Sequence, residues 1–215
     1  MQRVKIWDLP TRLFHWAIVL LVIAAWCSQE LDRMELHVLI GYTILALVIF
    51  RIIWGFIGSD TARFTQFLHS PLKAFRHLSH LTRREEDREV GHNAAGGWMV
   101  LLMLLLLGIQ AGTGLFANDD GNTEGPLMHF VSKAESDYLS HIHSLNFDLI
   151  EIVVALHILA ILAYAILKRH DLVRPMVTGV KSMPDGVIAP RLVSPVRAIL
   201  ALAVAAGLVA WVVRL

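Results

Sequence analysis

Cysteine and charge are both scarce in this chain of 215 residues. Cys27 is the only cysteine, so an internal disulfide is excluded. The C-x-x-C-H motif that attaches haem covalently is missing, and any haem here would therefore be bound non-covalently. The sequence also lacks a glycine-rich phosphate loop, a metalloprotease motif and a nucleic-acid-binding signature.

Charged residues make up only 17% of the chain and lie in patches between long apolar runs. Hydrophobic residues account for 56%, and the mean hydropathy is +0.59. These values predict an all-α membrane protein whose helices contact lipid. Nothing outside the apolar runs is long enough for a soluble domain. The predicted membrane spans are 13–28, 36–57, 94–117, 145–168 and 194–213.

The lysines and arginines between the spans predict the orientation. Their numbers along the chain, from the N-terminal segment to the C-terminal one, are 3, 1, 6, 1, 5 and 1. Because cytoplasmic segments carry the excess of positive charge, the N-terminus is predicted to be cytoplasmic and the C-terminus to lie outside.

Four histidines lie within or at the ends of the predicted spans. His143 and His157 are fourteen residues apart, which on a helix places both rings within about 40° of one face and roughly 21 Å apart along the axis. His15 begins the first span, at the cytoplasmic side, and His37 begins the second, at the outer side. Matching the levels pairs His37 with His143 and His15 with His157. Because ionisable residues inside a membrane are costly, four in two matched pairs predict ligands of a bound group.

Neighbouring residues favour haem iron over a bare metal ion. Gly41, one turn after His37, leaves room for a porphyrin. Arg51 lies on the same face and can bind a haem propionate, although it can equally extend to the cytoplasmic surface. Zinc would want about four ligands per site, and each level offers two histidines. The rival outer ligand, His141, lies on nearly the opposite helix face from His157, which favours His143.

Four motifs resemble the bacterial cytochrome b561 family, which includes the di-haem cytochrome b subunits of nickel-iron hydrogenases. They are DLPTRLFHW, LHVLIGYTILALVIFRIIWG, GHNAAGGWM and the His-x13-His spacing of the fourth span. The resemblance covers about residues 5–170. It implies a four-helix transmembrane bundle (1–170) holding two b haems between pairs of histidines. Residues 171–193 would be a cytoplasmic linker and residues 194–215 an additional transmembrane helix.

The resemblance also implies a function at the bacterial inner membrane. The protein would pass electrons between a periplasmic partner and the quinone pool. That partner would be a dehydrogenase, a hydrogenase or a soluble cytochrome. Two alternatives stay open, a superoxide:quinone oxidoreductase that acts alone and a haem-free transporter of metal or protons.

A quinone site is expected at the entrance of the third span. His92 and Asn93 can hydrogen-bond quinone oxygens there, while Gly96 and Gly97 allow close approach. The formate dehydrogenase relatives of the family have a similar asparagine beside the inner haem, which implies the same use. The alternative is that this stretch only packs helices.

Two further segments give weaker indications of contacts with other molecules. Loop 118–144 has five acidic residues against Lys133 alone, which indicates either a docking surface for a periplasmic electron carrier or an ordinary solvated loop. Small residues four apart in the last span permit close helix contact, either with the core or with a second copy of the chain.

Overall fold

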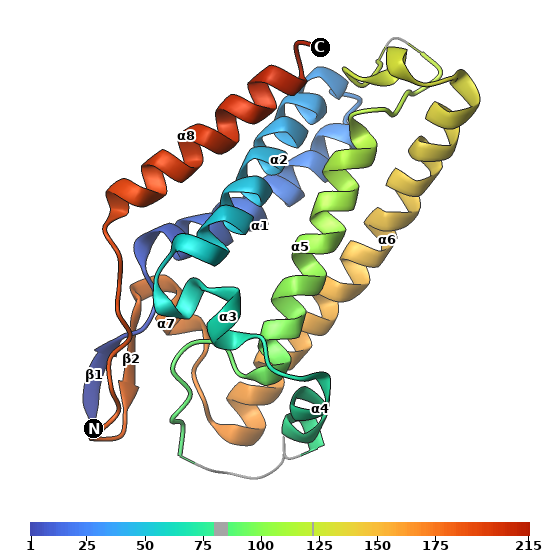
Figure 1. Cartoon of the computed structure of the whole chain (residues 1–215). Coiled ribbons are helices and arrows are strands. Elements are labelled where there is room, and N and C mark those ends of the chain that lie inside the picture. Colours follow the sequence, from blue (N-terminus) through green and yellow to red (C-terminus); the bar gives the residue numbers. More distant parts are fainter. Residues whose placement is uncertain (80–85, 122) are drawn as a thin grey trace. The chain divides into compact units, whose positions relative to one another are not determined.

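The computed structural model describes residues 1–79, 86–121 and 123–215, and its secondary structure is mainly helical (Figure 1). By their contacts the residues form two compact units, each described here by itself. The first unit contains Met1–Leu13, Ile52–Leu102 and Val153–Ala198. The second unit contains Phe14–Arg51, Met103–Ile152 and Ile199–Leu215.

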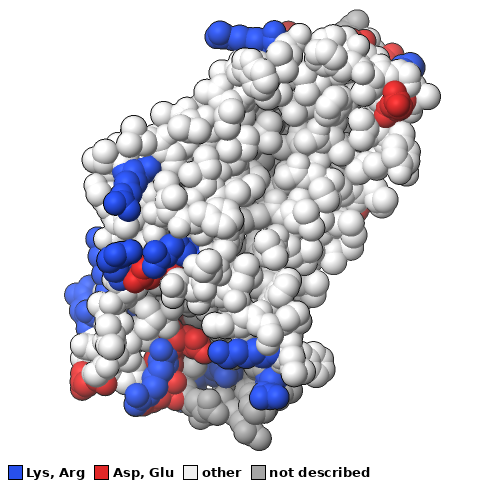
Figure 2. All heavy atoms as spheres, in the orientation of Figure 1, with Lys and Arg blue, Asp and Glu red and all other residues white. Residues whose placement is uncertain are grey.

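Among the residues that the structure describes, five helices are long and apolar enough to cross a membrane, which confirms the all-α membrane fold and the predicted number of spans. The face of the molecule in Figure 2 has wide areas without Lys, Arg, Asp or Glu, as lipid contact requires. The five are α1 (Leu9–Glu30), α2 (Met34–Ile57), α5 (Ala94–Gly114), α6 (Lys133–Ala163) and α8 (Pro195–Val212).

Helix α6 begins twelve residues before the predicted span, at Lys133 instead of 145. A capping box explains the early start. The Glu135 carboxylate accepts from the Ser132 backbone N–H at 2.8 Å, and the Ser132 hydroxyl accepts from the Glu135 N–H at 3.3 Å. The second half of the predicted acidic loop 118–144 is therefore helical. At its other end α6 passes into a π-helical turn, Tyr164–Lys168, which Arg169 closes in the left-handed conformation.

The first unit contains a small sheet. Strand β1 (Gln2–Lys5) pairs antiparallel with β2 (Val180–Met183), with Gln2 opposite Met183. Val4, Ile6, Trp7 and Met183 form its buried core. The predicted linker 171–193 thus contains a strand, and it also contains the short helix α7 (Val173–Thr178). Two other short helices belong to this unit, α3 (Phe64–Phe67) and α4 (Pro71–Ser79).

Asp8 fixes the start of α1 in the first unit. Its carboxylate accepts from the backbone N–H of Thr11 at 2.8 Å, which caps the helix, and from the indole N–H of Trp54 at 3.2 Å. Asp8 is 4% exposed and Trp54 is fully buried. One carboxylate therefore joins the first turn of α1 to the last turns of α2.

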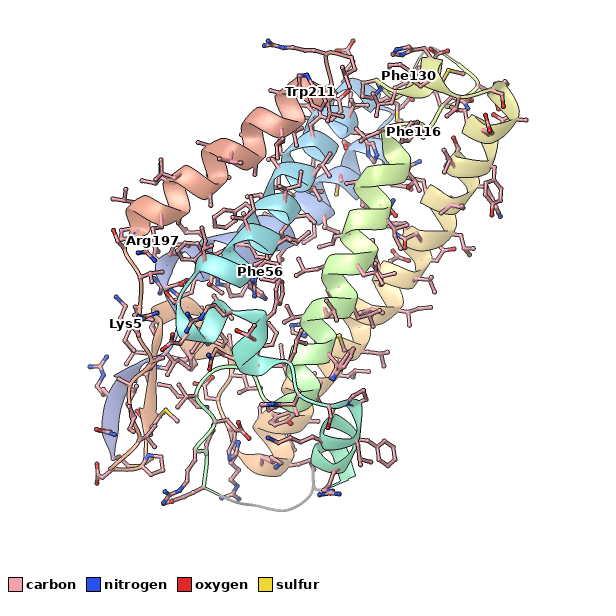
Figure 3. All side chains as sticks on the ribbon, viewed as in Figure 1. Lys5, Phe56, Phe116, Phe130, Arg197 and Trp211 are labelled. Carbon is pink, nitrogen blue, oxygen red and sulfur yellow. The ribbon has the colours of Figure 1, made fainter. Side chains whose placement is uncertain are left out.

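The second unit holds the longer parts of α1, α2, α5 and α6, together with most of α8. Their outward side chains are mainly Leu, Ile and Val. Three aromatic residues, Phe116, Phe130 and Trp211, lie at one end of this unit (Figure 3). Aromatic rings gather at the boundary between membrane and water, so this end fits that boundary.

Candidate functional site

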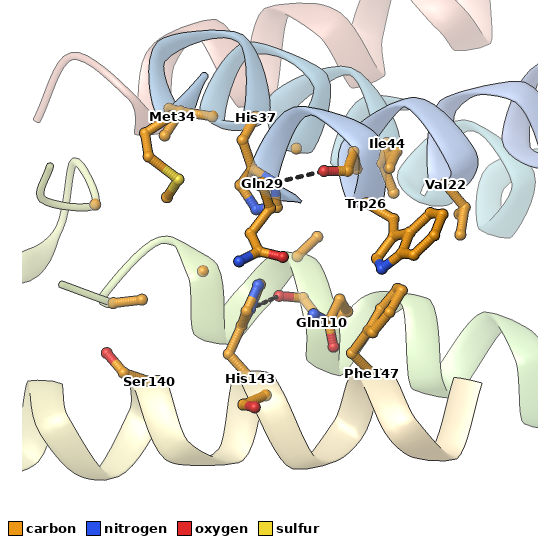
Figure 4. Close-up of a pocket in the computed structure, with 18 of the residues that line it drawn as sticks. Val22, Trp26, Gln29, Met34, His37, Ile44, Gln110, Ser140, His143 and Phe147 are labelled. Atoms are coloured by element: carbon orange, nitrogen blue, oxygen red, sulfur yellow. Dashed lines mark hydrogen bonds between the residues drawn. The ribbon is translucent and has the colours of Figure 1, made fainter. Parts of the chain in front are cut away.

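A cavity of about 530 Å³ lies within the second unit. Side chains of α1, α2, α5 and α6 line it, together with the segment that follows α5 (Figure 4). This volume is within the range of about 300–1,000 Å³ that is usual for small-molecule and cofactor sites.

His37 of α2 and His143 of α6 point toward one another from opposite walls of the cavity (Figure 4). Their ring centroids are 6.1 Å apart, and the ring planes make an angle of 71°. A metal ion between two imidazoles has metal–nitrogen bonds of about 2 Å, which places the bonded nitrogens about 4 Å and the centroids about 6 Å apart. The pair thus has the spacing of two axial ligands.

The Nδ1 atom of each histidine is hydrogen-bonded to a backbone carbonyl of a neighbouring helix. His37 Nδ1 lies 2.9 Å from the carbonyl oxygen of Ala25, and His143 Nδ1 lies 2.9 Å from that of Gln110. Because a carbonyl can only accept, each Nδ1 carries the proton in these bonds. Nε2 is then left as the lone-pair nitrogen on both rings, which is the arrangement that metal-ligating histidines need.

The cavity also has space and apolar walls for a porphyrin. A Cβ atom added at Gly41 would meet nothing within 4 Å, so this position opens onto empty space as expected. At Gly114 an added Cβ would come within 3.1 Å of the His143 ring. Trp26 and Phe147 lie to one side of the two histidines (Figure 4). The residues present therefore fit a haem bound between two imidazoles.

Charge on the cavity wall is all of one sign. Among the described residues that line it, four are acidic and none is Lys or Arg. Backbone N–H bonds from Thr123 and Gly121 lower the pKa of Asp119 and keep that carboxylate ionised. In the part of the chain that the structure describes, no group of three or more His, Cys, Asp or Glu side chains could hold a bare metal ion. The acidic residues are Glu30, Asp119, Asp148 and Glu151.

The other predicted haem residues lie elsewhere. His141 is exposed and, unlike His143, does not line the cavity. Arg51 is 2% exposed and is not among the described lining residues either. His15 belongs to the second unit and His157 to the first, so their pairing stays a prediction. His143 and His157 do share one uninterrupted α-helix, as their spacing requires.

Asn93 and His92 lie in the first unit, directly before α5. The Asn93 side chain caps this helix, because its Oδ1 accepts from the Gly96 N–H at 2.8 Å. Its Nδ2 donates to the Tyr164 hydroxyl at 2.9 Å. The His92 ring packs against Trp7 and Phe67, each with its centroid 4.7 Å away.

Gly97 permits the close packing expected of this stretch. A Cβ atom there would come within 2.7 Å of the Phe67 carbonyl oxygen, so only glycine fits. At Gly96 an added Cβ would meet the Asn93 Oδ1 at 3.3 Å. The structure thus shows a packing use for Gly97, and the quinone contact stays a prediction.

Comparison with known families shows which cofactor the protein binds. Residues 6–179 match the family described as prokaryotic cytochrome b561. The chain belongs to this family. The match ends before α8, and no curated protein or solved structure matches the chain. As a prokaryotic cytochrome b561, the protein is a membrane-bound haem b electron-transfer protein, which sets aside the haem-free transporter.

Several residues that support the site were not found from the sequence. Gln110 and Ala25 act through their backbone carbonyls, which no side-chain motif reveals. Asn146 had a readable signal, because it is an amide three residues after His143 within an apolar run. It is 4% exposed and donates to the Leu106 carbonyl at 3.0 Å and to the Gln110 side-chain oxygen at 2.7 Å. It thus holds the turn of α5 that faces His143.

Proposed function

We propose that this cytochrome b561 holds two b haems and transfers electrons between a periplasmic redox partner and the quinone pool of the inner membrane. One haem is bound by His37 and His143. The observation that carries this assignment is their facing geometry, with both Nδ1 atoms occupied by carbonyls. The second haem is bound by His15 and His157.

The side chains fix what a haem between His37 and His143 can do. When bound, the haem supplies a one-electron redox centre. Because His37 and His143 would both hold the iron, no coordination site would stay open for oxygen, which favours electron transfer. The carbonyls of Ala25 and Gln110 orient the two rings, while Trp26 and Phe147 help to keep water away.

The proposed orientation places the His37/His143 cavity on the periplasmic side. Its support is the alternation of Lys and Arg between the spans, with the N-terminus cytoplasmic and the C-terminus periplasmic. Electrons then pass between this haem and the deeper His15/His157 haem. A quinone contact at Asn93 and His92 lies on the cytoplasmic side in the same orientation.

The charge of the cavity wall supports a protein partner over superoxide. Superoxide is an anion, and the four acidic residues of the described wall repel it, although Lys133 donates a hydrogen bond to the lining residue Asn118. The same wall attracts a partner that presents lysine or arginine near its own redox centre. Stopped-flow reduction of the haem by superoxide, with and without quinone, tests this choice. Rapid reduction by superoxide would favour the stand-alone oxidoreductase.

Removal of single histidines tests the haem assignment. Purified wild-type protein should give two low-spin b haems in a pyridine haemochrome assay. His37→Ala and His143→Ala should each remove one haem, whereas His141→Ala, the matched control, should remove none. Fewer than two haems in well-folded wild-type protein would refute the two-haem proposal. Full haem content in His143→Ala together with loss in His141→Ala would move the outer ligand to His141.

A further inference from the structure

Each carbonyl that holds a cavity histidine also accepts a hydrogen bond from a hydroxyl group. Ser28 Oγ donates to the Ala25 carbonyl oxygen at 2.8 Å, the same oxygen that His37 Nδ1 contacts. Thr113 Oγ1 lies 3.1 Å from the Gln110 carbonyl oxygen, which His143 Nδ1 contacts. In both helices the hydroxyl residue is three positions after the carbonyl. The two sides of the cavity thus share one arrangement.

The two hydroxyls differ in how fully they use this carbonyl. Ser28 is 3% exposed, and its hydroxyl donates to Ala25 at a short distance. Thr113 divides its donation, since its Oγ1 also lies 2.7 Å from the Ile109 carbonyl oxygen. It also lies 3.3 Å from His143 Nδ1, and because Nδ1 carries the proton the hydroxyl can only accept there, which opposes the effect of the shared carbonyl. Ser28 should therefore have the stronger influence on its carbonyl.

A shared acceptor weakens each of the bonds it receives. When a hydroxyl donates to a carbonyl oxygen, less electron density remains for the imidazole N–H. A weaker N–H···O bond makes the imidazole a poorer electron donor to the iron, which destabilises the ferric state. Iron with a less basic ligand is easier to reduce, so the hydroxyl raises the redox potential.

We propose that Ser28 is a positioning residue that raises the redox potential of the haem held by His37 and His143, by sharing the Ala25 carbonyl that binds the His37 Nδ1–H group. This inference rests on the haem assignment made above. It concerns a residue outside the proposed ligand pair, and it assigns that residue a specific effect on electron transfer.

Redox titration of nearly isosteric variants tests the proposal. Ser28→Ala and Thr113→Val remove one hydroxyl each with little change of shape. Thr43→Val is the matched control, because Thr43 Oγ1 donates at 3.0 Å to Leu39, a carbonyl of its own helix that holds neither histidine. The titration follows the haem absorption band, and electron paramagnetic resonance of the oxidised protein reports the axial ligand field.

Ser28→Ala is expected to lower the potential of one haem and leave the other unchanged. The ratio of oxidised to reduced haem at a fixed potential should shift by up to about tenfold. A tenfold shift equals about 59 mV for one electron. Thr113→Val removes a donor to the Gln110 carbonyl and an acceptor near His143 Nδ1 together, so it should change the potential by less, and Thr43→Val should not change it.

The outcomes separate this inference from the haem assignment. If His37→Ala and His143→Ala remove a haem but Ser28→Ala leaves its potential and resonance spectrum as in Thr43→Val, the tuning role is overturned and the assignment stands. A raised potential in Ser28→Ala overturns it too. If the histidine variants keep both haems, both proposals fail. Should Ser28→Ala not fold, Ser28→Cys, which keeps only a weak donor, should lower the potential in the same way.

Discussion

Replacement of Gly114 by alanine tests the position of the His143 ring directly. The added Cβ would lie 3.1 Å from Cε1 and 3.3 Å from Nδ1 of His143. Carbon atoms in contact prefer about 3.5–4.0 Å, so the ring has to move by a few tenths of an ångström. The crowded Nδ1 atom is also the one that donates a hydrogen bond to the carbonyl of Gln110, on the same helix as Gly114. The ring cannot move without weakening this bond or its alignment with His37.

Two opposing terms set the size of the effect. Alanine in place of glycine stabilises a helix interior by about 0.5–1 kcal/mol, and at Gly114, the last residue of α5, the gain is at most of this size. Crowding of a packed site costs about 1–3 kcal/mol. The first term is present with or without haem, whereas the second is largest when a bound iron fixes the ring. Haem affinity at this site should therefore fall by about 5- to 150-fold, while the thermal stability of the haem-free protein changes little.

Gly112 provides the matched control for Gly114. It lies on the same helix, and a Cβ added there would meet nothing within 4 Å. Gly112→Ala should keep both haems with unchanged spectra. Haem content by pyridine haemochrome, haem transfer to apomyoglobin and the low-spin resonance signal measure the difference. If Gly114→Ala behaves as Gly112→Ala does in all three, His143 is not an axial ligand in this geometry.

Three further substitutions probe the rest of the molecule. Asn146→Leu removes the hydrogen bonds to the Leu106 carbonyl and the Gln110 side chain, so it should lower the free energy of unfolding by about 1–3 kcal/mol and weaken haem binding. An unchanged melting temperature and haem content would contradict the supporting role of Asn146. Asp8→Ala removes a helix cap and the bond from Trp54, and should destabilise the protein by about 1–3 kcal/mol in a thermal melt while the haem spectra stay as in the wild type. Asn93→Leu should slow haem oxidation by a quinone analogue about two- to tenfold with the spectrum intact, and normal quinone kinetics would argue against a contact there.

Local patterns along the sequence determined the membrane fold. Apolar runs of about twenty residues have one stable solution in a bilayer, because backbone groups in lipid must be hydrogen-bonded within a helix. The fourteen-residue spacing of His143 and His157 predicted that both lie on one helix and close to the same face of it, because each residue of a helix turns by the same angle. Depth matching then paired His37 with His143, and the structure brings these two rings together. The early start of α6 was also encoded locally, in the capping box of Ser132 and Glu135, which the predicted span boundaries did not take into account.

Only the tertiary structure decided which atoms support the site. Whether a given backbone carbonyl accepts from His37 or His143 depends on the rotation and height of a neighbouring helix, which no local period encodes. The pairing of β1 with β2 joins residues about 180 positions apart, and the bond from Asn93 to Tyr164 spans 71 positions. Such contacts arise from the packing of whole elements. The sequence by itself therefore determined the helices and predicted the histidine pair, while helix packing decided the carbonyls, hydroxyls and amides that hold the two rings in place.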